Sequence, residues 1–411
     1  MELRQLVDEA ANDLERLRAI RRDIHRHPEL GLQLPHTLAR VLGSIEGLGL
    51  ETHRSDTISS AVVRITGDKP GPTVVLRADL DALGLHEDSR EDFSSEIDGR
   101  MHACGHDLHA AIGVGAIRLL HAHRHQLPGE VLFLFQPGEE GDNGADRMLD
   151  EGALELASGS LVGAYALHVT TALPLGIFST RPGPLMAGSA TLNVTVRGAG
   201  GHGSAPHLAR DPNQVLAEII TGLQTMVTRR FNVFDPVIVT VGWMRGGQEG
   251  TVNVIPNTAS FGATVRTFSA QSLAKMETFG RELVEGIAAA HGLSVDIEFR
   301  SVTEPVINDP RHVVLADRVA TEMFGAERRV EMPTPIGGAE DFAAILHAVP
   351  GAFIFVGACP PDLDPSTAPY NHSNLARFDD SVLPDAAAYL AALAFARLAE
   401  VAPSDSARSG G

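Results

Sequence analysis

The sequence predicts an α/β protein whose main domain is discontinuous: a mixed, mostly parallel sheet flanked by helices, with a smaller α+β domain inserted into it. Two observations carry this prediction. Continuous apolar runs such as 131–135 and 352–356 alternate with helical patterns in both outer parts of the chain, as expected for strands buried on both faces. Between about 186 and 300 the strands alternate apolar and polar residues instead.

Periodicity and turn chemistry predict the elements of the outer domain. Apolar residues at three- and four-residue steps indicate an amphipathic helix over 3–27 that ends near His27-Pro28. β-Branched runs at 61–65 and 73–77 are separated by turn-forming residues and indicate two strands. The remaining predictions are helices over about 107–123, 144–151, 310–324, 339–348 and 383–400 and strands over 131–135, 162–167 and 352–356.

The inserted domain has a different order of elements, namely strand, helix, two strands, helix and strand. These elements cover about 190–197, 212–229, 236–243, 258–267, 270–291 and 294–299. Such an order is typical of a small ferredoxin-like sandwich. We therefore predict four parts of the chain: the first part of the outer domain (1–185), the inserted domain (186–300), the second part of the outer domain (301–400) and a flexible tail (401–411).

Length, charge and cysteine content narrow the class of protein. A chain of 411 residues exceeds one ordinary hydrophobic core, so two domains are expected. The net charge of −19 argues against nucleic acid or an anionic membrane as a partner, because both attract a basic surface. The cysteines are Cys104 and Cys359 alone, and residues 1–10 lack the pattern of a signal peptide. These features predict a cytoplasmic protein.

Residues 101–109 carry one thiol, three imidazoles and a carboxylate in a short segment. A thiolate and an imidazole two positions apart, Cys104 and His106, can converge on one zinc-like cation. The alternative is a helix start, with Asp107 in the first turn before an apolar run. Taken alone, this segment supports both interpretations.

Further candidate ligands follow predicted strands, where open α/β sheets place their binding crevice. Glu139 and Glu140 come after 131–135, His168 ends another strand, and His372 lies in a later loop. A solvated turn would explain any one of them, but adjacent carboxylates after a buried strand repel each other unless cations compensate. Five side chains of types that could hold two metal ions are therefore present: Cys104, His106, Glu140, His168 and His372.

Glu139 is not needed as a ligand in that set. A hydrolase requires a free carboxylate beside a metal-activated water, and Glu139 could supply it. Such a carboxylate takes the proton of the water and later delivers it to the leaving nitrogen. A bound metal lowers the pKa of the water to about 7, so the nucleophile exists at neutral pH without an extreme base.

The motifs that contain these residues resemble the metallo-amidohydrolase branch of the aminoacylase and carboxypeptidase G superfamily. That branch includes hippurate hydrolases, N-acyl-amino-acid amidohydrolases and plant indole-acetyl-amino-acid hydrolases. The matching motifs run almost from end to end of the chain. They are His25 to Gly31, Leu76 to Ala82, Met101 to His109, Gln136 to Gly141, Ala166 to His168, Gly201 to His207, Asn253 to Pro256, Thr264 to Phe268, Gly338 to Phe342, and His372.

The resemblance implies a dinuclear metal-dependent enzyme that hydrolyses the amide of an N-acyl or N-aroyl amino acid to a carboxylic acid and a free amino acid. The implied ligands of two divalent ions are Cys104, His106, Glu140, His168 and His372. Glu139 is the implied general base, and the inserted domain is a lid through which two subunits form a homodimer. The thiolate favours zinc, although manganese, nickel or cobalt suits the same ligands.

In the lid the resemblance assigns residues that contact the substrate. His202 would reach the active site of the partner subunit and stabilise the oxyanion, the alternative being a surface histidine in a Gly-rich turn. Asn253 and Arg266 match substrate-contacting positions, and the fork of an arginine suits a carboxylate, although an ordinary strand arginine is the alternative. Gly337 and Gly338 would let backbone amides approach the ligand at a helix start, unless they form only an N-cap turn.

The chain departs from other branches of the superfamily at Arg77, where those branches carry a metal-binding histidine. The resemblance implies that Cys104 supplies the missing ligand and that Asp79 orients a ligand from behind. His102 and His109 are predicted to lie outside the ligand set.

Two other functions stay open on the sequence. A di-metal dipeptidase or aminopeptidase would need a group that grips a free α-amino end. A non-catalytic metal-binding homologue would bind ions without hydrolysis, but it would have no use for the uncoordinated carboxylate of Glu139.

Overall fold

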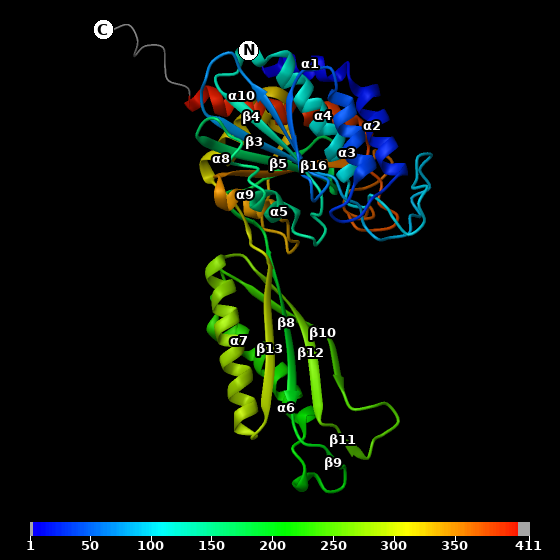
Figure 1. Cartoon of the computed structure of the whole chain (residues 1–411), viewed down its shortest axis with the longest axis vertical. Helices are drawn as coiled ribbons and strands as arrows, with labels where there is room; N and C mark the ends of the chain where they lie inside the picture. The colour runs from blue at the N-terminus through cyan, green and yellow to red at the C-terminus, as the bar shows by residue number, and fades with distance from the viewer. Residues whose placement is uncertain (1–2, 402–411) are drawn as a thin grey trace, which may run out of the picture. The chain divides into compact units, whose positions relative to one another are not determined.

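The computed structural model describes residues 3–401 and divides them into two compact units, each with its own hydrophobic core (Figure 1). Unit 1 comprises the described parts of Met1–Gly183, Ile307–Thr334 and Ala344–Gly411, and unit 2 comprises Pro184–Val306 and Pro335–Ala343. The sequence placed the inserted domain at 186–300 and did not foresee that a second segment joins unit 2. The predicted tail lies outside the described residues, except for Val401.

A mixed eight-stranded sheet forms the centre of unit 1. Its strands are β1 (Glu51–Arg54), β2 (Ala61–Thr66), β3 (Thr73–Asp79), β4 (Glu130–Gln136), β5 (Leu161–Pro174), β6 (Phe178–Thr180), β15 (Arg329–Glu331) and β16 (Gly351–Cys359). Their order is β1-β2-β4-β3-β5-β16-β6-β15. The four central strands β4, β3, β5 and β16 run parallel, so their carboxyl ends point toward the same edge of the sheet.

Helices pack against this sheet and against one another. The helices of unit 1 are α1 (Leu3–Ala11), α2 (Leu14–Arg26), α3 (Pro35–Ile45), α4 (His106–Ala122), α5 (Gly144–Asp150), α8 (Pro310–Phe324) and α10 (Leu383–Val401), and α9 (Phe342–Ala348) begins in unit 2. Both α4 and α10 contact β3 and β5, and they also contact each other. The first residues of α4 are thereby held against the sheet core.

The single helix predicted over 3–27 is wrong, because the chain breaks between α1 and α2. Asn12 and Asp13 donate their backbone N–H groups to Glu9 and Ala10 in tight turns. Asparagine and aspartate compete with helical hydrogen bonds, so a break at this pair follows from their chemistry. Helix α3, the edge strands β1 and β15, and the short strand β6 between β16 and β15 were not predicted.

Helix α10 has a composition that also suits a membrane. Within residues 3–401, Asp380–Val401 is the one helical stretch long and apolar enough to span a bilayer. However, 83% of its apolar window is buried inside the protein. The burial identifies α10 as a core helix of unit 1 in this structure.

Unit 2 is an antiparallel sheet with two helices. Its strands β8 (Gly188–Arg197), β10 (Val237–Gly246), β12 (Thr258–Thr267) and β13 (Ser294–Thr303) take the order β10-β12-β8-β13, and α6 (Pro212–Arg230) and α7 (Ala270–Ala290) pack on it. A separate pair joins β9 (Gly201–His202) and β11 (Val254–Ile255). The order of elements is the predicted one, and the predicted fold class is confirmed.

Candidate metal centre

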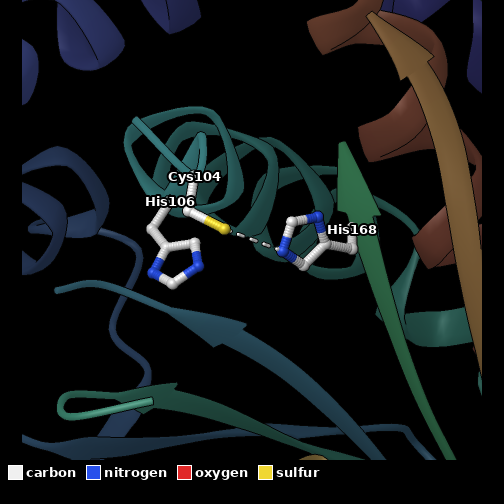
Figure 2. A group of neighbouring side chains, drawn as sticks. All are labelled: Cys104, His106 and His168. Carbon is white, nitrogen blue, oxygen red and sulfur yellow. Dashed lines mark hydrogen bonds between the residues drawn. The ribbon is translucent and has the colours of Figure 1, made fainter. Parts of the chain in front are cut away.

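Three segments of unit 1 that are distant in sequence meet at the carboxyl edge of the parallel strands. The Sγ atom of Cys104 lies 3.3 Å from Nε2 of His168 and 3.3 Å from Nε2 of His372. Cys104 lies in the turn before α4, two residues from its first residue His106, whereas His168 belongs to β5 and His372 to the loop after β16. Figure 2 shows Cys104 and His106 at the start of α4, with the thiol directed at the imidazole of His168.

The protonation of His168 suits a metal ligand. Its Nδ1 donates to the carbonyl of Val169 at 2.7 Å, which leaves the lone pair of Nε2 facing Cys104. Burial, and then the nearby His109, hold the pKa of His168 well below its ordinary value. The ring is therefore neutral at physiological pH, as metal coordination requires.

His106 is fully buried, and neither of its ring nitrogens has a hydrogen-bond partner among residues 3–401. Its nitrogens instead lie 3.6 Å from Oδ1 of Asp81, 3.7 Å from Oδ2 of Asp79 and 4.0 Å from Oε1 of Glu140. A buried polar group without a partner costs free energy. A cation between these donors would satisfy the imidazole, so the residues present fit a metal ion.

The adjacent carboxylates form part of the same cluster. Ligand atoms of His106, Glu139 and Glu140 lie within 4.8 Å of one another, as do those of Cys104, Glu140 and His372. Nε2 of His372 is 3.2 Å from Oε1 of Glu140. Burial raises the pKa of the Cys104 thiol to about 12 in the metal-free protein, so a cation would be needed to hold it as thiolate. These donors have the types that zinc and similar ions bind.

Asp81 organises the turn that carries the two glutamates, although it was not among the predicted site residues. The buried carboxylate accepts the backbone N–H of Glu139 and that of Glu140, one on each oxygen and each at 3.0 Å. It also faces His106. The signal available in the sequence was a second aspartate two residues after Asp79 at a strand end.

Asp79 lies beside the cluster, with its Oδ2 3.7 Å from Nε2 of His106, and its role of orienting a ligand stays a prediction. It accepts hydrogen bonds from Arg77 Nη1 at 2.6 Å and from His109 Nδ1 at 2.5 Å. Burial opposes its ionisation, but the charges of Arg77, His106 and His109 outweigh burial and hold its pKa well below the ordinary value. His109 also accepts the N–H of Val169, so both of its ring nitrogens are occupied by protein groups.

Asp107 serves the start of α4. Its Oδ2 accepts from Arg21 Nε at 2.7 Å and from His25 Nδ1 at 2.8 Å, and all three side chains are buried. Helix α2 is thereby joined to the turn that carries Cys104. Both interpretations of residues 101–109 thus apply to different side chains: some belong to the cluster and Asp107 anchors the helix.

In unit 2 the predicted substrate residues form two groups. His202 and Asn253 are adjacent, because β9 pairs with β11 and Gly203 donates its N–H to the carbonyl of Asn253 at 2.8 Å. His202 is exposed, and its Nδ1 accepts from the hydroxyl of Ser204 at 2.9 Å. Arg266 lies near the opposite end of the sheet and donates to Ser189 Oγ at 2.6 Å.

Gly337 and Gly338 do not precede a helix directly, so the predicted helix start is wrong at this point. Helix α9 begins at Phe342, and residues 339–341 form an irregular segment. The carbonyl of Gly338 accepts the N–H of Ala187, which ties the pair to the segment before β8. At neither glycine would an added Cβ meet backbone, so close packing does not require glycine there.

Thiol, imidazole and carboxylate donors gathered at the parallel strands of a mixed α/β sheet, beside a further carboxylate, indicate a metallohydrolase. Residues 75–396 match the model of peptidase family M20/M25/M40. The chain therefore belongs to this family, and the resemblance drawn from the motifs is confirmed.

Individual relatives agree with this assignment. The chain is 35% identical to the IAA-amino acid hydrolase ILR1-like 4 of Arabidopsis thaliana over 93% of its own length and 86% of that protein. It is 34% identical to the N-acetylcysteine deacetylase of Bacillus subtilis over 83% and 88%. A Bacillus subtilis structure described as a dinuclear metal-binding peptidase of the M20 family superposes with a TM-score of 0.79 at 30% identity, over 93% and 97% of the two chains. The predicted enzyme class, a metal-dependent amidohydrolase, is confirmed.

Proposed function

We propose that the protein hydrolyses the amide of N-acyl amino acids to a carboxylic acid and a free amino acid. The observation that carries this proposal is the cluster of Cys104, His168 and His372, with Glu139 and Glu140 on an adjoining turn. Relatives named for amide hydrolysis of acylated amino acids support the substrate class.

Two divalent ions would be held by Cys104, His106, Glu140, His168 and His372, and when bound they would supply Lewis-acid activation of water and of the amide carbonyl. Five donors suffice for two ions if one donor is shared. The side chains of Cys104 and Glu140 each lie within 4.8 Å of two different sets of candidate ligands. Either of them could therefore be the ligand that the two ions share. The thiolate favours zinc among the candidate metals.

Within this site Glu139 would act as the general base. Its backbone is held by Asp81, so its carboxylate stays next to the donors of His106 and Glu140. There it can accept a proton from the attacking water and pass it to the leaving nitrogen. His202 would stabilise the oxyanion, and Asn253, Arg266 and the amides at Gly337 and Gly338 would contact the substrate.

A homodimer formed through unit 2 would bring these groups together. About 27 Å of β12, at about 3.4 Å per residue, separates Arg266 from Thr258, and His202 lies beyond that far end. One substrate therefore does not reach both residues of one chain. The edge strand β10 exposes Ile238, Trp243 and Met244, an apolar strip suited to pairing with a second copy. A cytoplasmic location stays a prediction.

The base assignment is tested by Glu139→Gln. Loss of the proton acceptor is expected to lower kcat about 10²–10⁴-fold while both ions stay bound, as measured by amine release and by metal analysis of the same sample. Glu155→Gln, an exposed exchange of the same kind, is the control and should retain wild-type turnover. Normal turnover of Glu139→Gln with full metal content would exclude Glu139 as the base.

The substrate class is tested with a panel of N-acetyl, N-benzoyl and indole-acetyl amino acids beside dipeptides that carry a free amino end. The proposal expects hydrolysis of acylated compounds. Faster hydrolysis of free-amine dipeptides would favour the dipeptidase alternative, and metal binding without any hydrolysis would favour a binding protein.

A further inference from the structure

The loop that carries His372 contains a second polar side chain directed into unit 1. Asn371 precedes the predicted ligand by one residue and is half-buried. Its Nδ2 lies 3.1 Å from the carbonyl oxygen of Cys104 and 3.0 Å from that of Val169. Its Oδ1 accepts the backbone N–H of Thr171 at 3.4 Å. Two acceptors on one side and a donor on the other define the orientation of the amide.

The carbonyl of Val169 links this amide to His168. The same oxygen accepts from Nδ1 of His168 at 2.7 Å, which is the bond that leaves Nε2 of that ring facing the thiol. Asn371 therefore donates to the oxygen that orients His168 and to the backbone carbonyl of Cys104. It is also covalently joined to His372, the next residue in the chain. The segments that carry Cys104, His168 and His372 are more than 60 residues apart in sequence. Cys104 and His372 lie outside the helices and strands, so regular secondary structure does not hold them together.

The backbone at His372 needs such support. Its φ is +72°, in the left-handed region that residues other than glycine rarely adopt. The N–H of His372 donates to the carbonyl of Ala103 at 2.9 Å, next to the carbonyl that Asn371 holds. Consecutive residues of the loop thus bind consecutive carbonyls of the segment before α4, and these bonds hold the two loop segments side by side.

We propose that Asn371 is a positioning residue of the metal centre, because its one side-chain amide joins the carbonyl of Cys104 to the carbonyl that orients His168, directly before His372. It does not donate an atom to the ion. Its effect is to hold the thiol 3.3 Å from each of the two imidazoles by protein contacts alone, so that metal binding does not have to order the loop. The inference rests on the proposed function for the identity of the ligands.

The test is the zinc affinity of Asn371→Leu, a replacement of similar shape that lacks both donors. The matched control is Asn374→Leu, three residues further on, where the amide contacts Asp88 at the surface. Affinity is measured on purified full-length protein by competition with a chromophoric chelator, and the Tm of the metal-free protein is recorded beside it. Cys104→Ser is included as a variant that loses a predicted ligand.

Asn371→Leu is expected to bind zinc about 10–100-fold more weakly than wild type, and Asn374→Leu to bind as wild type does. An unchanged zinc affinity would overturn the proposal, whatever happens to Tm, because a merely structural role lowers Tm alone. If Asn371→Leu does not fold, Asn371→Ala gives the same measurement with a smaller side chain. Failure of the wild type to hydrolyse acyl amino acids would contradict the proposed function but would leave this comparison of affinities intact.

Discussion

The candidate residues of the two units are arranged in opposite ways. In unit 1 they lie in direct contact: the buried thiol of Cys104 is 3.3 Å from the buried imidazole of His168 and 3.3 Å from the exposed imidazole of His372. Asp79 and Asp81 hold neighbouring groups of the cluster by hydrogen bonds. In unit 2 they are exposed or half-buried and are far apart: His202 lies on the separate β9-β11 pair, beyond the first residue of β12, and Arg266 lies near the last residue of β12. The candidate ligands can therefore be supplied by unit 1 alone, whereas the roles proposed for the unit 2 residues depend on a substrate that unit 2 does not enclose.

The largest expected change in activity tests whether His202, which lies far from Arg266 of its own chain, acts in the partner subunit. If His202 serves the partner subunit, His202→Ala lowers kcat about 10²–10³-fold with metal content unchanged. Mixed dimers of Glu139→Gln with His202→Ala then contain one site in which both residues are intact. Random mixing restores about a quarter of wild-type activity, since half of the dimers are mixed and half of their sites are whole.

Co-expression with two different tags and purification through both gives the mixed dimer directly. Each parent variant alone is the control. No gain of activity on mixing would show that His202 acts within its own chain or not at all, and the contrast between the two units would then need another explanation.

A smaller effect tests the bracing within unit 1. Asp81→Asn keeps the shape of the side chain but turns an NH₂ group toward one of two backbone N–H donors. We expect a loss of about 10–100-fold in metal affinity or kcat, because the turn with Glu139 and Glu140 is displaced. Asp98→Asn, an exposed exchange in the loop before α4, is the control. Equal kinetics and metal binding in both variants would refute a positioning role for Asp81.

The smallest effect concerns stability and pH. Burial opposes ionisation of Glu87, but the hydrogen bond and charge of His25 outweigh it and lower the pKa of Glu87 to about 2. A carboxylate with a depressed pKa stabilises the fold above its ordinary value of 4.5 and loses that contribution as pH falls toward about 2.

Wild type should therefore lose about 2–4 °C more in Tm than Glu87→Gln between those pH values. Calorimetry over this range measures the difference. Parallel curves for the two proteins would mean that the pair with His25 contributes nothing to the pH dependence.

Much of the secondary structure follows from local sequence patterns whose effect does not depend on the tertiary structure. The helix over 310–324 and the strand over 258–267 have their predicted limits, because proline and an aspartate N-cap begin the helix and alternation defines the strand. The break at Asn12-Asp13 and the short strands β6 and β15 were missed, since three residues carry too little periodicity to be read.

For the site, the sequence by itself determined which chemical groups are available: a thiol, imidazoles and carboxylates at strand ends, in motifs of a known family. It did not determine which of them touch. That Asp81 holds the turn of the glutamates, that Asp107 serves a helix rather than the cluster, and that Asn371 joins Cys104 to His168 are results of tertiary structure. The physical reason is that these contacts are hydrogen bonds between segments up to 267 residues apart in sequence. Such a bond requires two distant parts of the backbone to meet, and it produces no periodic pattern in the sequence of either part.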